Sequence, residues 1–126
     1  MRTSKFCCQI KVKPKGRPRF NGRIAYTDKT TRDFERDVKT NLSQLFRNKP
    51  LTGPLSVELE IFFKAPKKTA FAYPPRGDCD NLFKSVADAA NEILWEDDSQ
   101  IVEMKCSKKW ADSDYFILTV TELDLK

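Results

Sequence analysis

The sequence predicts a single small α+β domain in which a mixed or mostly antiparallel sheet packs against two main helices. The length of 126 residues suits one domain with its own hydrophobic core. Segments in which apolar and polar residues alternate stand beside two segments whose apolar residues recur at helical spacing. Because the sequence contains no repeat, low-complexity tract or linker, we expect residues 1–126 to form one domain.

The N-terminal third is expected to contain a strand, a loop and a helix. Residues 5–12 end in alternating polar and apolar positions and predict a strand. The proline, glycine and asparagine content of residues 14–22 predicts a loop, and residues 24–26 a short extended piece. The helix should begin near Thr30 or Thr31. Its apolar stripe is predicted to consist of Phe34, Val38, Leu42 and Leu45.

The remaining strands are expected in the C-terminal part of the chain. Residues 55–63 alternate most regularly and predict a strand. A basic and aromatic loop with three prolines follows over residues 64–77, and loops of this length in small domains are usually functional or mobile. Residues 100–106 and 115–121 predict the last two strands, with residues 110–114 as the turn between them.

A second helix is expected between that loop and the last strands. Asp80 or Asn81 can cap its N-terminus, because such side chains accept hydrogen bonds from free backbone N–H groups. Its buried face is predicted to consist of Leu82, Val86, Ala89, Ala90, Ile93 and Leu94. The helix would then end at the acidic run WEDD, whose carboxylates oppose the negative end of the helix dipole. A bound divalent cation would compensate this unfavourable placement.

The composition excludes several classes of protein. The chain contains no histidine, which removes Ser-His-Asp and Cys-His mechanisms and His-bound metal sites. Catalysis must therefore rely on carboxylates, lysine, tyrosine, cysteine or a metal ion. No apolar run approaches the ~20 residues of a membrane span, and the four cysteines form no CxxC pair. We expect reduced thiols in a cytoplasmic protein with no membrane partner.

Charge is divided unevenly along the chain. Residues 1–76 hold 18 Lys and Arg against 6 Asp and Glu, whereas residues 77–126 hold 5 against 12. The overall charge of +5 therefore averages a net +12 and a net −7. A basic half attracts a polyanion such as nucleic acid, while an acidic half binds phosphate only when something neutralises it.

The segment GDCDNLFK places Asp78 and Asp80 two residues apart where a loop enters the second helix. In extended chain such residues point the same way, so both carboxylates can converge on one hard cation. Alternatively, Asp80 caps the helix and Asp78 is solvated. Lys84 lies four residues after Asp80, where it either pairs with Asp80 or Asp88 or places a cation beside a phosphate in transfer. The run WEDD either completes this site with a carboxylate or is a solvated turn.

Basic and aromatic residues are interleaved in two loops. The basic residues are Lys11, Lys13, Lys15, Arg17, Arg19 and Arg23 in the first and Lys64, Lys67, Lys68 and Arg76 in the second. The aromatic residues among them are Phe20, Tyr26, Phe71 and Tyr73. Unpaired nucleotides stack on such rings while their phosphates meet the cations. The alternative is an ordinary basic surface whose rings turn into the core.

Four sequence blocks, taken in order, resemble the RusA family of Holliday-junction resolvases, which are small endodeoxyribonucleases of bacteria and their phages. The blocks are PKGRPRF (residues 14–20), GRIAYT (residues 22–27), GDCDNLFKSVADAAN (residues 77–91) and WEDDSQIV (residues 95–102). The resemblance spans most of the chain, and the ordered pair D-x-D-N-L-x-K and D-D-x-Q is its most specific part.

This resemblance implies a homodimeric enzyme that nicks two strands of a four-way DNA junction symmetrically with Mg²⁺, for which Mn²⁺ can substitute. The family's metal-binding acids fall on Asp78, Asp80 and Asp98, with Asp97 as the alternative to Asp98, and its essential lysine falls on Lys84. The basic residues expected to bind DNA are Lys13, Lys15, Arg17, Arg19, Arg23, Lys67, Lys68 and Arg76.

We therefore predict a metal-dependent endonuclease that resolves four-way junctions in DNA recombination and repair, with a metal-activated water as the nucleophile. Two alternatives are left open. A catalytically silent protein that binds branched or single-stranded DNA would keep the basic loops, but it has no reason to keep the three acids and the lysine together. A nuclease of the same fold that acts on flaps or other branched DNA would carry the same residues.

Overall fold

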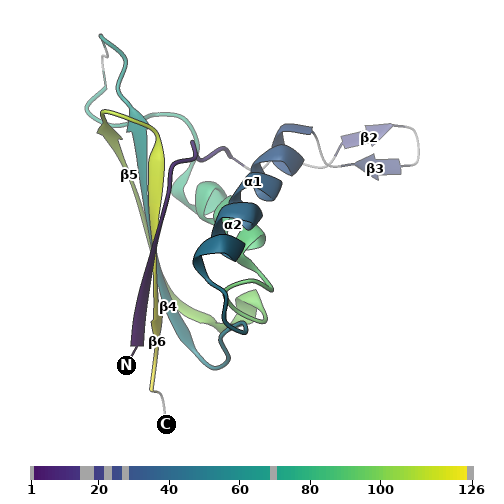
Figure 1. The fold of residues 1–126 in the computed structure, drawn as a ribbon. Coiled ribbons are helices and arrows are strands. Elements are labelled where there is room, and N and C mark those ends of the chain that lie inside the picture. The colour runs from purple at the N-terminus through teal and green to yellow at the C-terminus, as the bar shows by residue number, and fades with distance from the viewer. Residues whose placement is uncertain (1, 15–18, 22–23, 27–28, 69–70, 125–126) are drawn as a thin grey trace.

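A computed structural model describes residues 2–14, 19–21, 24–26, 29–68 and 71–124 of the protein. One four-stranded sheet carries both long helices on the same face (Figure 1). The strands lie in the order β1-β6-β4-β5. The elements are β1 (Arg2–Cys8), α1 (Lys29–Leu45), β4 (Leu55–Lys64), α2 (Cys79–Ala90), β5 (Ile101–Ala111) and β6 (Tyr115–Glu122). Because β6 runs antiparallel to β1 and β4 while β4 and β5 run parallel, the sheet is mixed, and the predicted α+β class is confirmed.

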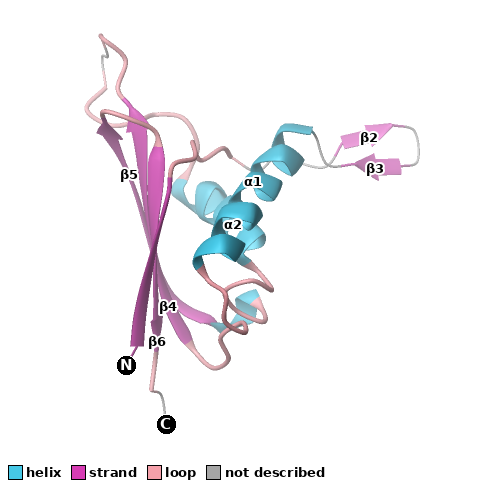
Figure 2. Ribbon diagram, in the orientation of Figure 1, coloured by secondary structure: helices cyan, strands magenta, loops and turns pink. Residues whose placement is uncertain are grey.

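A separate two-stranded ribbon lies beyond the N-terminal end of α1 and away from the sheet (Figure 2). It pairs β2 (Arg19–Asn21) with β3 (Ile24–Tyr26) in antiparallel register. The extended piece at residues 24–26 is therefore confirmed, but the end of the predicted loop at residues 14–22 is a strand. Local turn-forming composition is overridden here by pairing with β3.

The core lies between the helices and one face of the sheet. Every second residue of β4, from Leu55 to Ile61, is fully buried, as its alternating pattern predicts. On α1 the stripe through Phe34, Val38 and Leu42 is buried against it. Leu45, predicted to belong to this stripe, is instead 54% exposed at the end of α1, and the next residue, Phe46, packs against the core in its place. Among the described residues, none of the helices has the length and hydropathy needed to span a bilayer.

Strand pairing, more than local pattern, sets the ends of the strands. The predicted strand at residues 5–12 ends at Cys8, which pairs with Phe116 near the start of β6, so the following residues have no partner strand. The strand predicted to end at residue 106 is β5, which continues to Ala111. It does so because residues 103–111 of β5 pair one by one with residues 56–64 of β4. Trp110, expected in a turn, is therefore part of β5.

Both ends of the second predicted helix differ from expectation. The N-cap residue of α2 is Asp78. The predicted caps, Asp80 and Asn81, lie inside the first turn of the helix. The helix ends at Ala90, and Glu92 adopts a left-handed φ of 71°, so Ile93 and Leu94 lie in the turn that follows. The acidic run is thus not at the C-terminus of a helix. Asp97 instead caps the N-terminus of a short 3-10 helix (Asp98–Gln100), where the dipole favours a negative charge.

Candidate active site

A tight turn at Gly77 sets the position of the two aspartates at the start of α2. Gly77 has a left-handed φ of +81°, and a Cβ at this position would lie 3.0 Å from a side-chain carbon of Leu82. Only glycine adopts this turn without strain. The Gly77 carbonyl accepts a 2.6 Å hydrogen bond from Lys108 Nζ on β5. The start of α2 is therefore held against the second half of β5.

Asp78 and Asp80 stand at the positive end of the α2 dipole. Asp78 is the N-cap residue, but its side chain makes no capping hydrogen bond. Asp80 lies in the first turn, where its Oδ1 accepts the backbone N–H of Asn81 at 2.9 Å. The helix dipole favours negative charge at this end. The Asp78 carboxylate is not used in capping, and Asp80 uses one of its two oxygens on a backbone N–H of the first turn.

The two aspartates of the acidic run have different roles. Asp97 accepts the backbone N–H of Ser99 at 3.0 Å and donates its own N–H to the Gln100 side chain at 2.8 Å, which forms a capping box. Hydrogen bonds from the side chain and backbone of Ser99 lower the pKa of the Asp97 carboxyl. The carboxylate of Asp98 instead accepts a 2.7 Å hydrogen bond from the indole Nε1 of the fully buried Trp95. A charge-assisted bond from a rigid ring fixes the orientation of Asp98.

Asp98 and one face of α2 line the same hollow, of about 300 Å³, which we call the acidic hollow. Its walls are Asp80, Phe83, Lys84, Ala87, Asp88, Asp98, Ile101 and Met104. The five residues from α2 recur at helical spacing and therefore share one face. Of the predicted catalytic residues, the hollow brings together Asp80, Lys84 and Asp98. Asp78 and the alternative ligand Asp97 are not among its walls.

The acidic hollow suits a hard cation, because such cations bind oxygen ligands and three carboxylates line the hollow: Asp80, Asp88 and Asp98. Across the described ranges, no three Asp, Glu, Cys or His side chains gather closely enough to enclose a metal ion. Mg²⁺ does not require such an enclosure, since it is usually held by one or two carboxylates together with waters and substrate phosphates. The residues present therefore fit an open magnesium site that substrate completes.

A pair of thiols lies next to Asp80. Cys106 on β5 is half-buried and lies close to Cys79 of α2. Burial raises the pKa of the Cys106 thiol to about 12, and the neighbouring Cys79 and Asp80 contribute to the rise. At neutral pH this thiol is uncharged, so it adds no negative charge beside Asp80.

Three residues that build the site were not recognised from the sequence. They are Trp95, Lys108 and Gln100. The Gln100 side chain donates from Nε2 to the backbone carbonyls of Leu51 and Gly53, at 2.9 and 3.0 Å. These bonds attach the turn that carries Asp98 to the segment before β4. Trp95 and Gln100 both belong to the block WEDDSQIV, so the block itself was the available signal, whereas nothing local distinguishes Lys108.

The basic residues predicted to bind DNA are only partly covered by the described structure. Lys15, Arg17 and Arg23 lie outside the described residues, and the side chain of Arg19 on β2 is not described. The remaining four, Lys13, Lys67, Lys68 and Arg76, are all exposed. Their charge is therefore available to a polyanion.

Comparison with known proteins places the chain in a family. The family model described as Endodeoxyribonuclease RusA matches residues 9–120, which include both acidic segments. The chain is also 28% identical over 125 residues to the uncharacterized protein YqaN of Bacillus subtilis (strain 168), covering 86% of this chain and 88% of that protein. The family match confirms the resemblance carried by the sequence blocks. The chain therefore belongs to the RusA endodeoxyribonuclease family.

Proposed function

We propose that this protein is a Mg²⁺-dependent, structure-specific endonuclease that resolves four-way DNA junctions by paired symmetric nicks. It acts as a homodimer in the cytoplasm, in DNA recombination and repair. The observation that carries the proposal is the acidic hollow, in which Asp80, Asp98 and Lys84 line one cavity. Membership of the RusA endodeoxyribonuclease family supports a nuclease of the junction-resolving type.

In the proposed site the carboxylates hold the cation. Asp80 and Asp98 would be its ligands from the walls of the hollow, and Asp78, the N-cap residue of α2, is the third predicted ligand although it is not among those walls. A bound Mg²⁺ supplies Lewis-acid polarisation of a phosphoryl oxygen and lowers the pKa of a bound water. The Trp95 indole occupies one oxygen of Asp98, so the other is directed to the cation.

Lys84 supplies the second positive charge of the proposed site. It lies one helical turn after Asp80 and lines the same wall. From there its ammonium group stabilises the negative charge that develops on the phosphate in the transition state. Because Lys84 is exposed, water screens this electrostatic interaction in part.

The proposed dimer follows from the symmetry of the substrate. A four-way junction has two equivalent strands to cut, and a two-fold homodimer presents two equivalent sites. Each site needs basic surface on the same protomer to hold the phosphates of its strand, and Lys13, Lys67, Lys68 and Arg76 are exposed cations available for this.

A cleavage assay tests the proposal. A labelled four-way junction, a linear duplex and a flapped duplex with the same arm sequences are incubated with the protein in Mg²⁺, in Mn²⁺ and in a chelator. Paired symmetric nicks in the junction alone, dependent on the cation and sealed by DNA ligase, are the expected result. Preferred cutting of the flapped duplex would show that the flap, and not the four-way junction, is the substrate. Tight junction binding without cleavage in either metal would identify a silent DNA-binding protein and overturn the enzymatic assignment.

A further inference from the structure

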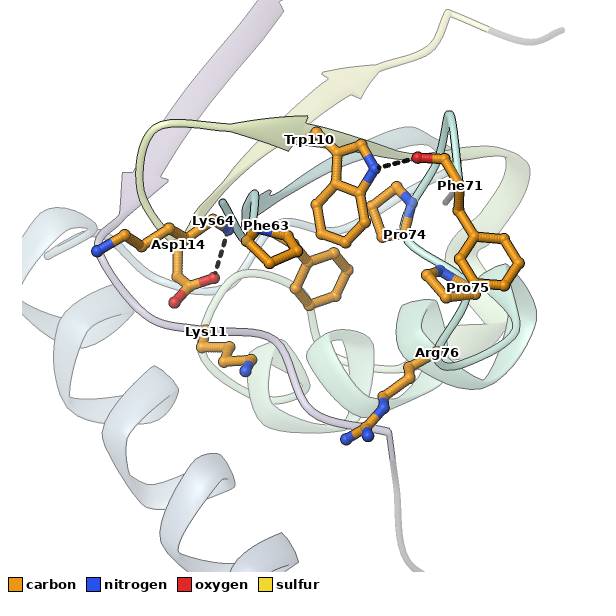
Figure 3. A pocket seen from close by; sticks show the side chains of 10 residues that line it. Lys11, Phe63, Lys64, Phe71, Pro74, Pro75, Arg76, Trp110 and Asp114 are labelled. Carbon is orange, nitrogen blue, oxygen red and sulfur yellow. Dashed lines mark hydrogen bonds between the residues drawn. The ribbon is translucent and has the colours of Figure 1, made fainter. Parts of the chain in front are cut away.

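A second hollow, of about 420 Å³, lies where β4 and β5 end and the loop after β4 folds back toward α2 (Figure 3). We call it the aromatic hollow and define it by Lys11, Phe63, Phe71, Pro75, Arg76 and Trp110. None of its residues belongs to the acidic hollow. Its chemistry therefore requires a separate explanation.

The walls of the aromatic hollow are held by hydrogen bonds within the chain. Trp110 Nε1 donates to the backbone carbonyl of Phe71 at 3.0 Å, and the backbone N–H of Lys64 donates to Asp114 Oδ1 at 2.8 Å (Figure 3). These bonds attach the loop to β5 and to the turn after it. The rings are therefore positioned before any ligand arrives, which reduces the entropy lost on binding. Because its N–H is already used, Trp110 offers a ligand the face of its ring.

The aromatic hollow combines flat rings with positive charges. The Phe71 ring in its wall is 49% exposed. Tyr73, which is not among the walls, is 57% exposed, and its ring centroid lies 6.1 Å from that of Phe71. Lys11 and Arg76 lie across the hollow from Trp110 (Figure 3). A ligand that matches this arrangement has a flat aromatic group attached to an anionic chain. An unstacked nucleotide of a DNA strand has this form, since bases stack on aromatic rings and phosphates bind Lys and Arg.

The aromatic hollow begins close to the aspartates of the proposed active site. Arg76 precedes Asp78 by two residues, and Trp110 follows Lys108 by two residues on the same face of β5. Lys108 in turn holds the carbonyl of Gly77. Asp80, the first wall of the acidic hollow, follows Arg76 by four residues. Four residues of extended chain span at most about 14 Å, which corresponds to about four nucleotide steps along a DNA strand.

We propose that the aromatic hollow binds one unstacked nucleobase of the substrate, within about four nucleotides of the phosphate that is cleaved at the acidic hollow. The location of that phosphate rests on the proposed function, whereas the capture of a base does not. Removing a base from its stack is least unfavourable where stacking is already interrupted, as it is at a branch point. Base capture therefore favours branched DNA over linear duplex.

Two single strands of equal charge test the inference by their affinity for the full chain in a chelator. One is oligothymidylate, and the other is an oligomer of the same length with abasic deoxyribose at every position. Because their phosphates are the same, only the bases distinguish them. The unaltered protein should bind oligothymidylate about five- to 150-fold more tightly. Phe71→Ala should abolish this preference while keeping the carbonyl that Trp110 uses, and Phe71→Tyr should retain it.

A matched control is available on the other face of the sheet. Phe62 stacks on Tyr115 with ring centroids 4.4 Å apart, and Phe62→Ala should leave the preference unchanged. Equal affinity of the unaltered protein for both strands, or a preference that persists in Phe71→Ala, would overturn the inference. The measurement involves no cleavage, so base preference without junction cleavage would contradict only the proposed function. Junction cleavage without base preference would contradict only base capture.

Discussion

The acidic hollow and the aromatic hollow lie toward opposite ends of β5, and they are assembled in opposite ways. The acidic hollow is drawn from residues 80–104, which form one helix, the turn after it and the start of one strand. The aromatic hollow joins Lys11, the end of β4, the loop after it, the end of β5 and Asp114. The groups proposed to perform the chemistry are thus close in sequence, whereas those proposed to recognise the shape of the DNA meet only in the folded chain.

Asp80→Asn separates the two hollows most sharply. The substitution removes a proposed metal ligand and one negative charge without changing the shape of the side chain. We expect cleavage to be abolished in Mg²⁺, while junction affinity is unchanged or slightly tighter. Cleavage and gel-shift assays on the same junction measure the two effects. The control variant is Asp37→Asn, on the exposed face of α1. This variant should cleave the junction normally. Normal cleavage by the Asp80 variant would remove this residue from the site.

The pair Asp98→Asn and Asp97→Asn tests which acid of the run belongs to the acidic hollow. Loss of a partner that only orients a metal ligand reduces activity about 10- to 100-fold, so loss of the ligand itself should cost at least about 100-fold. In Asp98→Asn the new amide oxygen can still accept the Trp95 N–H, which preserves the local fold. Asparagine also caps helices as well as aspartate does, so Asp97→Asn should keep nearly full activity. The reverse ranking would assign the metal to Asp97.

These expectations show how far the sequence predicts the site. The two acids Asp78 and Asp80 and the lysine after them lie within one or two helical turns of each other, so their spacing made a shared site one of two open interpretations. The buried Trp95 indole holds Asp98, and not Asp97, toward this site. The turn that carries these residues follows the end of α2 at Ala90, whereas the sequence pattern predicted that the helix continues through it. The structure also leaves Asp78 outside the walls of the hollow.

The aromatic hollow was predicted only in part. The sequence placed Phe71 and Tyr73 on a basic loop as candidates for base stacking, but it placed Trp110 in a turn. Trp110 is in β5 because it pairs with Phe63 of β4, 47 positions earlier in the chain. Such pairing is decided by the whole sheet and carries no local signal. The same reason explains why the ends of the strands were less predictable than their centres.

Lys84→Ala tests whether the charge on α2 serves the reaction or only binding. We expect turnover of bound junction to fall about 10- to 100-fold. The loss should be smaller than that caused by removing a cation from a site without water, because Lys84 is exposed and water screens its charge. Single-turnover rates at saturating protein separate this effect from affinity, which should change little. Lys105→Ala is the matched control, since Lys105 pairs with Glu58 on the opposite face of the sheet. Weaker binding with normal turnover would make Lys84 a contact that positions the DNA.

Arg76→Ala gives the smallest expected effect and divides the aromatic hollow into its charge and its rings. Removing one cation that pairs with a phosphate lowers the slope of log affinity against log salt by about 1, so we expect binding a few-fold weaker and a shallower slope. Arg47→Ala, beyond the end of α1, should leave the slope unchanged. The preference of the Arg76 variant for oligothymidylate over the abasic strand should persist, because the rings remain. If the preference falls while the slope is unchanged, Arg76 stacks on the base and does not pair with a phosphate, since a guanidinium plane can do either.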